Sequence, residues 1–316
     1  MSGKRPTPLK PDSYAQAIVT RVPELAELAH IETRILCNLD SSDVGPEEWS
    51  ALAGEIARAR EAHDGVVVIH GTDTMAYTAA ALSFALSGLD RPVVLTGSQR
   101  PLGEIRTDAR RNLVDAVDLA TRDLPEVGVC FDGRLLRGNR ATKGDAWSYG
   151  AFASPGCAPL ARLGLDVEIG AHLRRPSRPF AVDARFDARV VVAWVVPGME
   201  PSSLARVADG ARGLVLAAFG VGNVPLRPQS VAAEVARLVE RGVDVLVVTQ
   251  ARAGAVDFSL YESGAQLHEA GAISGGDLLL EAAVVKLMHA LALHPDDAAA
   301  RRRYLLDDVA GERAPA

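Results

Sequence analysis

Residues 66–84 read V-V-V-I-H-G-T-D-T-M-A-Y-T-A-A-A-L-S-F, and this stretch decides the fold. Its first four residues form a continuous β-branched run, which predicts a short buried strand. A polar turn around Gly71 follows, and residues 75–86 then have the composition and length of a helix. A strand that enters a helix through such a turn is the repeating unit of α/β folds, in which helical crossovers keep the strands parallel. Thr72 and Asp73 are therefore expected at the carboxyl end of a parallel strand, where open α/β sheets bind ligands.

The same alternation of strands and helices extends over most of the chain. Around the opening stretch we expect helices over 14–28, 47–62 and 107–121, and strands over 31–39, 92–96, 127–131 and 134–136, the last two joined by an Asp132-Gly133 turn. A second unit has expected strands over 190–196, 213–218 and 243–249 and helices over 201–209, 228–241 and 277–293. The sequence thus predicts an N-terminal α/β domain over 1–175, a linker over 176–188 and a C-terminal α/β domain over 189–316. Each domain is expected to be a mainly parallel sheet with helices on both faces.

The composition argues against several classes of protein. The formal net charge of the 316 residues is −6, so we expect no nucleic-acid partner, which would need a basic face. The R-R-R run at 301–303 is expected to be a solvated helix end. No apolar run approaches the ~20 residues of a membrane span. Cys37, Cys130 and Cys157 lack metal-binding spacing, so we expect buried thiols in a reducing cytoplasm, with no metal and no cofactor.

Three expected strands end in polar turns. D-S-S-D at 40–43 follows the strand over 31–39, Thr72 and Asp73 follow the strand over 66–69, and T-G-S-Q at 96–99 follows the strand over 92–96. Capping of the helices that follow explains each turn on its own, since helices commonly begin at such residues. Because the ends of parallel strands meet at one edge of a sheet, all three together favour a binding crevice.

Lys143 is the candidate proton acceptor for a hydroxyl in that crevice. It lies in the loop R-G-N-R-A-T-K at 137–143, where a lysine is ordinarily just solvated. Beside Thr72 and Asp73, a partly desolvated lysine can take a proton from a hydroxyl while the aspartate holds it in place. Spacing alone does not establish that contact. His70, at the end of a buried strand, is expected to be a packed, hydrogen-bonded residue rather than a catalyst.

Five ordered segments resemble the L-asparaginase/glutaminase family, most closely its cytoplasmic type I bacterial members. They are H-G-T-D-T-M-A-Y-T-A-A-A-L-S-F at 70–84, L-T-G-S-Q-R-P at 95–101, D-S-S-D at 40–43, R-G-N-R-A-T-K at 137–143 and F-G-V-G-N-V-P at 219–225. The resemblance implies a homodimeric or homotetrameric enzyme that hydrolyses L-asparagine to L-aspartate and ammonia without metal or cofactor. It implies catalytic roles for Thr72, Asp73 and Lys143, and substrate binding by Asp40, Ser41, Ser42, Thr72 and Asp73.

One family feature has no counterpart in the sequence. The family's other catalytic threonine lies in a T-G-G-T-I-G-M motif on the first strand, and this motif is absent. We expect Met1 to correspond to the methionine that ends the motif, so that the first strand of the N-terminal sheet is missing. A missing central strand exposes two sheet edges, and unsatisfied backbone groups cost roughly 1–3 kcal/mol each. Protein expressed from Met1 is therefore expected to be insoluble or inactive.

Three alternative functions remain open at this point. Glutamine differs from asparagine by one methylene, worth only ~1–3 kcal/mol in a pocket, so a glutaminase is possible. The glutamine-deamidating subunit of a tRNA amidotransferase is a second alternative. A non-catalytic amino-acid-binding protein, which keeps the pocket and lacks the first strand, is the third.

Overall fold

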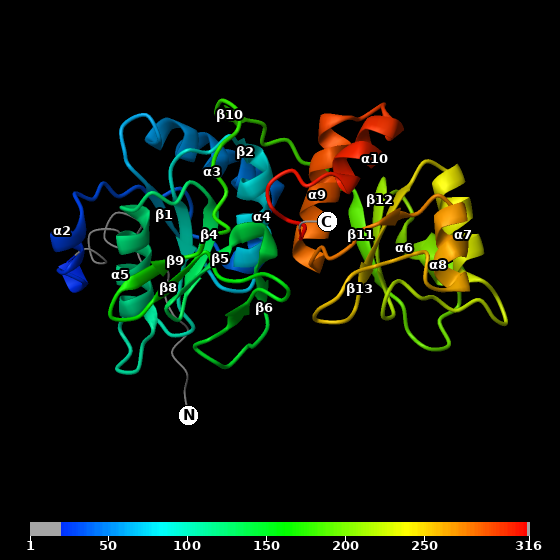
Figure 1. Ribbon diagram of the computed structural model, residues 1–316, viewed down its shortest axis with the longest axis horizontal. Coiled ribbons are helices and arrows are strands. Elements are labelled where there is room, and N and C mark those ends of the chain that lie inside the picture. Colours follow the sequence, from blue (N-terminus) through cyan, green and yellow to red (C-terminus); the bar gives the residue numbers. More distant parts are fainter. Residues whose placement is uncertain (1–19, 315–316) are drawn as a thin grey trace.

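The computed structural model describes residues 20–314, and their strands form two main sheets with helices packed on both (Figure 1). The two-unit α/β architecture expected from the sequence is confirmed. In Figure 1 the N-terminal half lies on the left and the C-terminal half on the right, with helices α4 (Met75–Ala85) and α9 (Leu280–Leu293) between them. Within the described part of the chain, no helix is both long and apolar enough to cross a membrane.

The N-terminal sheet has six strands, of which the first three are parallel. Its order is β1 (Val66–Ile69), β3 (Val93–Thr96), β4 (Val127–Phe131), β5 (Arg134–Arg137), β8 (Ala161–Leu163) and β9 (Val167–Ile169). Strands β4, β5, β8 and β9 pair antiparallel. The predicted turn between β4 and β5 has positive φ at both Asp132 and Gly133, as a tight two-residue hairpin requires.

Helices cover both faces of this sheet because alternate strand residues point to opposite sides. Val93 and Leu95 pack with residues of α3 (Pro46–Ala59) and α4 on one face. Val94, between them in sequence, packs with α5 (Ala109–Ala120) on the other. This arrangement places the carboxyl end of β1 next to the first turn of α4.

The strand expected over 31–39 is absent, so that prediction is wrong. Residues 29–40 have no regular secondary structure, and Leu36 and Leu39 are 45% and 49% exposed. A strand needs a hydrogen-bonded neighbour, and within residues 20–314 no strand pairs with this segment or with the outer edge of β1. Cys37 is exposed for the same reason and Cys157 is half-buried, so the expectation of buried thiols holds for Cys130 alone.

The first expected helix is interrupted. Residues 14–19 lie outside the described residues, residues 20–21 are helical, and the helix then stops before Pro23, which cannot continue it. A four-residue helix, α2 (Leu25–Leu28), follows. Short 3-10 turns η1 (Ser41–Asp43) and η2 (Gly138–Arg140) complete the local structure around the predicted site.

The C-terminal sheet is wholly parallel. Its order is β11 (Val190–Trp194), β12 (Gly213–Ala218), β13 (Asp244–Thr249) and β14 (Ile273–Ser274). One face packs with α6 (Ser202–Val207), α7 (Val231–Glu240) and α8 (Glu262–Glu269), and the other with α9 and α10 (Ala298–Leu306). Arg301, in α10, is nearly buried and its Nε donates to Asp244 Oδ2 at 2.5 Å, so a solvated helix end is the wrong description of this residue.

The two halves share an apolar interface. Trp49 of α3 and Phe84 of α4 pack with Val285 of α9 in one buried cluster. The linker is attached to the N-terminal half where β10 (Ala181–Val182) pairs antiparallel with β2 (Leu86–Ser87). Within the N-terminal half, a ladder of the same length joins β6 (Thr142–Lys143) to β7 (Phe152–Ala153) and carries the predicted catalytic lysine.

Acid should weaken the fold through His289, a buried residue of α9. Its Nδ1 lies 2.7 Å from the Tyr304 hydroxyl and its Nε2 lies 2.8 Å from the Asp183 carbonyl oxygen. Burial lowers the pKa of His289 below its ordinary value. In the unfolded chain this histidine takes up a proton near pH 6.5, whereas in the folded chain it stays neutral to a lower pH. The free energy of unfolding therefore falls as the pH drops below that value, by at most ~1.4 kcal/mol per pH unit for this group.

Urea unfolding at pH 7.5 and pH 5.5 measures this effect. His289→Gln keeps a donor and an acceptor but does not titrate, so it should lose less stability on acidification than the wild type. His268→Gln, at an exposed position, is the matched control and should behave as the wild type does. An equal loss in all three proteins would contradict the assignment.

Candidate active site

The turn after β1 is built against the Asp40–Asp43 region. A Cβ atom on Gly71 would lie 2.7 Å from the Ser41 side chain, so only glycine allows this approach. Thr74 Oγ1 donates a hydrogen bond to the Ser41 carbonyl oxygen at 2.5 Å. Two of the three predicted polar turns, at 40–43 and 70–74, are therefore in direct contact although the strand expected before the first has not formed.

Within the first turn, Asp40 and Ser42 are exposed and Ser41 is buried. Asp40 Oδ1 accepts hydrogen bonds from the Ser42 hydroxyl at 2.6 Å and the Ser42 amide at 2.9 Å. These bonds lower the pKa of Asp40, the hydroxyl bond more than the amide bond. The turn thus presents a fixed carboxylate to solvent, whereas the Ser41 side chain faces Gly71.

The three predicted catalytic residues are in contact. Lys143 Nζ lies 2.8 Å from Thr72 Oγ1 and 2.6 Å from Asp73 Oδ1, although 71 and 70 positions separate them in the chain. The lysine side chain is 18% exposed and the aspartate side chain 69%. The amine is thus largely shielded from water while the carboxylate stays open to a ligand.

Gln99 is a further residue of this group that was not among the predicted site residues. The Thr72 hydroxyl donates to Gln99 Oε1 at 3.1 Å, and Gln99 Nε2 donates to the carbonyl oxygens of Ala146 and Ser148 at 3.1 and 3.2 Å. Gln99 therefore orients the Thr72 hydroxyl and joins it to the loop after Lys143. Its position in the polar turn following β3 was the available signal, but only the fold shows which side chain of that turn reaches Thr72.

His70 is a packed residue, as expected. Its Nε2 lies 2.9 Å from Thr78 Oγ1, which also accepts a hydrogen bond from Trp49 Nε1 at 3.0 Å, and its Nδ1 lies 2.7 Å from the Gly71 carbonyl oxygen. Burial lowers the pKa of His70, which keeps the ring neutral at pH 7. Both ring nitrogens are occupied, so the imidazole supports the turn that carries Thr72.

A cavity of about 520 Å³ lies beside Lys143, on the side of the C-terminal half. Its lining includes Lys143, Thr249, Gln250, Asp277 and Glu281. Its volume falls within the roughly 300–1,000 Å³ of small-molecule sites. Thr72 and Asp73 lie outside this lining, so Lys143 stands between the cavity and the exposed surface at Asp73. Among residues 20–314 no group of three His, Cys, Asp or Glu side chains is placed to hold a metal ion.

This arrangement contains the parts needed to activate a hydroxyl. Lys143 Nζ, which donates to Thr72 Oγ1 in the structure, lies within the ~2.6–3.2 Å over which a base takes a proton. For that transfer the hydroxyl turns its proton from Gln99 Oε1 toward the amine. Asp73 holds the amine from the other side and Gln99 holds the hydroxyl. A nucleophile, a base and a group that orients the base are the elements of nucleophilic catalysis at a carbonyl carbon.

Comparison with known proteins gives the same picture over nearly the whole chain. The N-terminal domain model of asparaginase matches residues 1–175, and the glutaminase/asparaginase C-terminal domain model matches residues 189–305. L-asparaginase 1 of Escherichia coli K12 is 37% identical over 287 residues, which cover 88% of this chain and 82% of that protein.

Two proteins of Thermococcus kodakarensis are also similar to this chain, and their names give different activities. The solved structure of the thermostable L-asparaginase from Thermococcus kodakarensis superposes with a TM-score of 0.90 at 35% identity, covering 96% of this chain and 92% of that one. A subunit of the glutamyl-tRNA(Gln) amidotransferase of the same organism is 36% identical over 314 residues, which cover 95% of this chain and 70% of that protein. With both halves matched and the lysine, threonine and aspartate in contact, the chain belongs to the asparaginase/glutaminase family of amidohydrolases.

Proposed function

We propose that this protein hydrolyses the side-chain amide of L-asparagine to L-aspartate and ammonia. The observation that carries the proposal is the contact of Lys143 Nζ with both Thr72 Oγ1 and Asp73 Oδ1. The identity with L-asparaginase 1 of Escherichia coli and with the L-asparaginase of Thermococcus kodakarensis supports asparagine as the substrate.

In this proposal Lys143 takes the hydroxyl proton as the threonine oxygen bonds to the amide carbon. The proton passes to the amide nitrogen, the carbon–nitrogen bond breaks and ammonia leaves, and water then cleaves the ester to release aspartate. Asp73, 69% exposed, receives the ammonium group of the substrate. Asp40, Ser41 and Ser42 bind the rest of its backbone group, Ser41 through the turn it shares with Gly71.

We further propose that the full rate requires the second threonine that the family carries on its T-G-G-T-I-G-M strand. That motif is absent from the sequence, and the outer edge of β1 is unpaired within residues 20–314. A version of the chain with this strand joined to its start should release ammonia faster than the 316 residues alone. Equal rates in the two proteins would show that the full rate does not require the second threonine.

Two measurements separate the candidate functions. The first is ammonia release from asparagine and from glutamine, and the second is the binding of each amino acid, measured by calorimetry. We expect a higher kcat/KM for asparagine. A preference for glutamine would make the protein a glutaminase, and binding without ammonia release would make it a non-catalytic amino-acid-binding protein. Neither binding nor release, from the chain or from its extended version, would end the proposal.

A second candidate is suggested by the similarity to the glutamyl-tRNA(Gln) amidotransferase. Such a protein would deamidate glutamine only when the rest of its complex and the charged tRNA are present. The net charge of −6 gives RNA no general electrostatic attraction. Glutamine hydrolysis that stays slow until those components are added would favour this candidate.

Three further features belong to the same proposal. The domain division at 176–188 is supported by the family matches over 1–175 and 189–305. A homodimer or homotetramer is supported by the exposed Val192 and Trp194 of β11, which light scattering of the purified protein would test. A cytoplasmic location is supported by three cysteines that form no disulfide.

A further inference from the structure

Residues 138–143, which carry Lys143 and are called the lysine segment below, make four side-chain hydrogen bonds to the C-terminal half of the same chain. Asn139 Nδ2 donates to the Ala310 carbonyl oxygen at 2.9 Å. Arg140 Nη1 donates to Asp277 Oδ2 and to the Glu312 carbonyl oxygen, both at 2.7 Å. Thr142 Oγ1 donates to Glu281 Oε1 at 2.6 Å. Its own ladder, β6 with β7, is only two residues long. The N-terminal half supports the segment through the close packing of Gly138 on α4 and through backbone hydrogen bonds from Gly144 and Asp145 to Ala151. The side-chain contacts support it from the C-terminal half.

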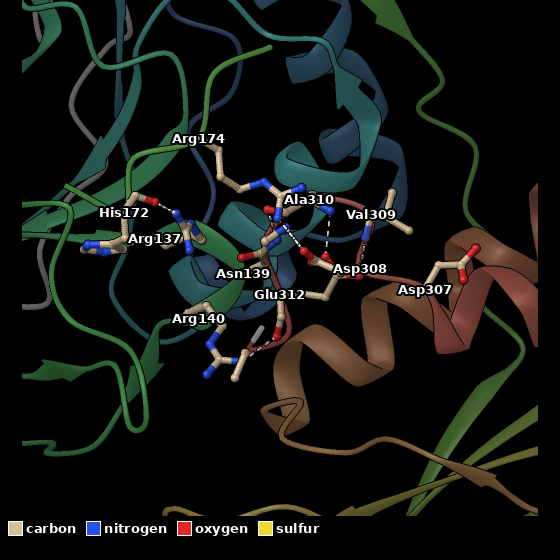
Figure 2. A network of polar contacts seen from close by, with 12 residues as sticks. Arg137, Asn139, Arg140, His172, Arg174, Asp307, Asp308, Val309, Ala310 and Glu312 are labelled. Carbon is tan, nitrogen blue, oxygen red and sulfur yellow. Dashed lines mark hydrogen bonds and ion pairs between the residues drawn. The ribbon is translucent and has the colours of Figure 1, made fainter. Parts of the chain in front are cut away.

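The contacts of Asn139 with Ala310 and of Arg140 with Glu312 involve the C-terminal end of the chain, which lies between the two halves (Figure 1). We call residues 307–314 the C-terminal strap. Glu312, fully buried, pairs with Lys286 at 2.6 Å and accepts hydrogen bonds from the amides of Val309 and Ala310 at 3.0 and 2.7 Å. The strap is thereby folded on itself, and Figure 2 shows Asn139 and Arg140 directed at it from the N-terminal half.

The second contact is made by the neighbour of the lysine. Adjacent side chains of a strand point to opposite sides. Thr142 points to Glu281, in the first turn of α9, and Lys143 points to Thr72 and Asp73. Because the two side chains leave the same short backbone in opposite directions, a bond that fixes Thr142 also fixes the direction of Lys143. Burial raises the pKa of Glu281, in agreement with a carboxyl group enclosed at this contact.

We propose that Thr142, Glu281 and Arg140 are positioning residues for Lys143: the C-terminal half, through Glu281, Asp277 and the C-terminal strap, holds the amine against the Thr72 hydroxyl. The proposal rests on the proposed function, in which Lys143 is the base. A base must lie within ~2.6–3.2 Å of the proton it takes, and a misplacement of about 1 Å costs on the order of 10²-fold in rate. None of the three positioning residues exchanges a proton with the substrate.

The test uses the whole protein in the form that hydrolyses the amide. Thr142→Val and Glu281→Leu each remove the hydrogen bond and should lower kcat by about 10- to 100-fold with KM changed by less than about threefold. Thr142→Ser and Glu281→Gln keep a donor and an acceptor, and should restore most of kcat. The double variant Thr142→Val with Glu281→Leu should be no slower than either single one, since both remove the same bond.

Arg174→Ala is the matched control. Arg174 also joins the N-terminal half to the strap, through an ion pair with Asp308, but among residues 20–314 its side chain makes no hydrogen bond or ion pair to the lysine segment. We expect its kcat to equal that of the wild type, because Glu312 still holds the part of the strap that binds Asn139 and Arg140. If Arg174→Ala lowers kcat as much as Glu281→Leu does, the contacts serve general stability and the proposal is overturned.

A second measurement does not depend on turnover. Limiting acetylation of the folded protein, quantified at Lys143 by mass spectrometry, reports how tightly the amine is held. Acetylation of Lys143 should be several times faster in Thr142→Val and Glu281→Leu than in the wild type or in Arg174→Ala. Unchanged acetylation in both overturns the inference whatever kcat does. A wild type that releases no ammonia defeats the proposed function alone, since the acetylation rates still decide this inference.

Discussion

Replacing Lys143 with methionine should lower kcat for amide hydrolysis by about 10²- to 10⁴-fold, the range expected when a general base is removed. The methionine keeps most of the volume of the side chain, so the fold should be retained. The effect is large because Lys143 Nζ lies 2.8 Å from the Thr72 hydroxyl, within reach of the proton that the nucleophile must lose. The measurement is ammonia release at saturating asparagine.

Two further substitutions separate the roles of charge and proton transfer. Lys143→Arg keeps a cation that can pair with Asp73, but a guanidinium does not give up a proton, so kcat should stay as low as in Lys143→Met. Thr72→Ala should lose activity to a similar extent, because residues that act as a unit are not additive. Arg206→Ala, an exposed change on α6, is the control with unchanged kcat. A Lys143→Met protein that retains more than about a tenth of kcat would contradict the assignment.

Breaking the buried ion pair of the C-terminal strap has the largest expected effect on stability. Lys286 and Glu312 have side chains that are 0% exposed, and their Nζ and Oε1 atoms are 2.6 Å apart. Lys286 Nζ also donates to the carbonyl oxygens of Leu305 and Asp307, at 3.2 and 2.5 Å. Burial lowers the pKa of Lys286, against the opposing effect of Glu312. Lys286→Met leaves the Glu312 carboxylate buried without its partner, which costs roughly 3–5 kcal/mol.

Denaturant unfolding at pH 7 measures this cost. Adding Glu312→Gln to Lys286→Met removes the unpaired charge and keeps an acceptor for one of the Val309 and Ala310 amides, so the double variant should be more stable than Lys286→Met alone. Arg175→Ala removes an exposed ion pair with Asp123 and is the control, because exposed pairs contribute little. A double variant that is less stable than Lys286→Met alone and than Glu312→Gln alone would show that the ion pair is not what stabilises the strap.

The failed prediction of a strand over 31–39 shows the limit of local pattern. The residues have the composition of a strand, but a strand forms only with a neighbour, and pairing depends on segments far away in sequence. The same reasoning applies to Arg301. An arginine run near the end of a chain is typical of a solvated helix end, yet Asp244, 57 positions earlier, lies within 2.5 Å of its Nε.

The sequence by itself determined the order of most strands and helices, the polar turn with Thr72 and Asp73 at the end of β1, and the polar turn at 40–43, although the strand expected before that turn is absent. It did so because burial on a strand or helix repeats with a short period that neighbouring residues reveal. It also made Lys143 a candidate through the resemblance of 137–143 to a family segment. None of these observations required knowledge of which segments touch.

Only the tertiary structure decided that Lys143 reaches Thr72, that Gln99 rather than another residue of its turn holds the hydroxyl, and that Glu281 and the C-terminal strap support the lysine segment. The partners in these contacts are 27 to 172 positions apart. Their meeting depends on how two sheets pack around α4 and α9, and packing of distant segments leaves no periodic trace in the residues that make the contact.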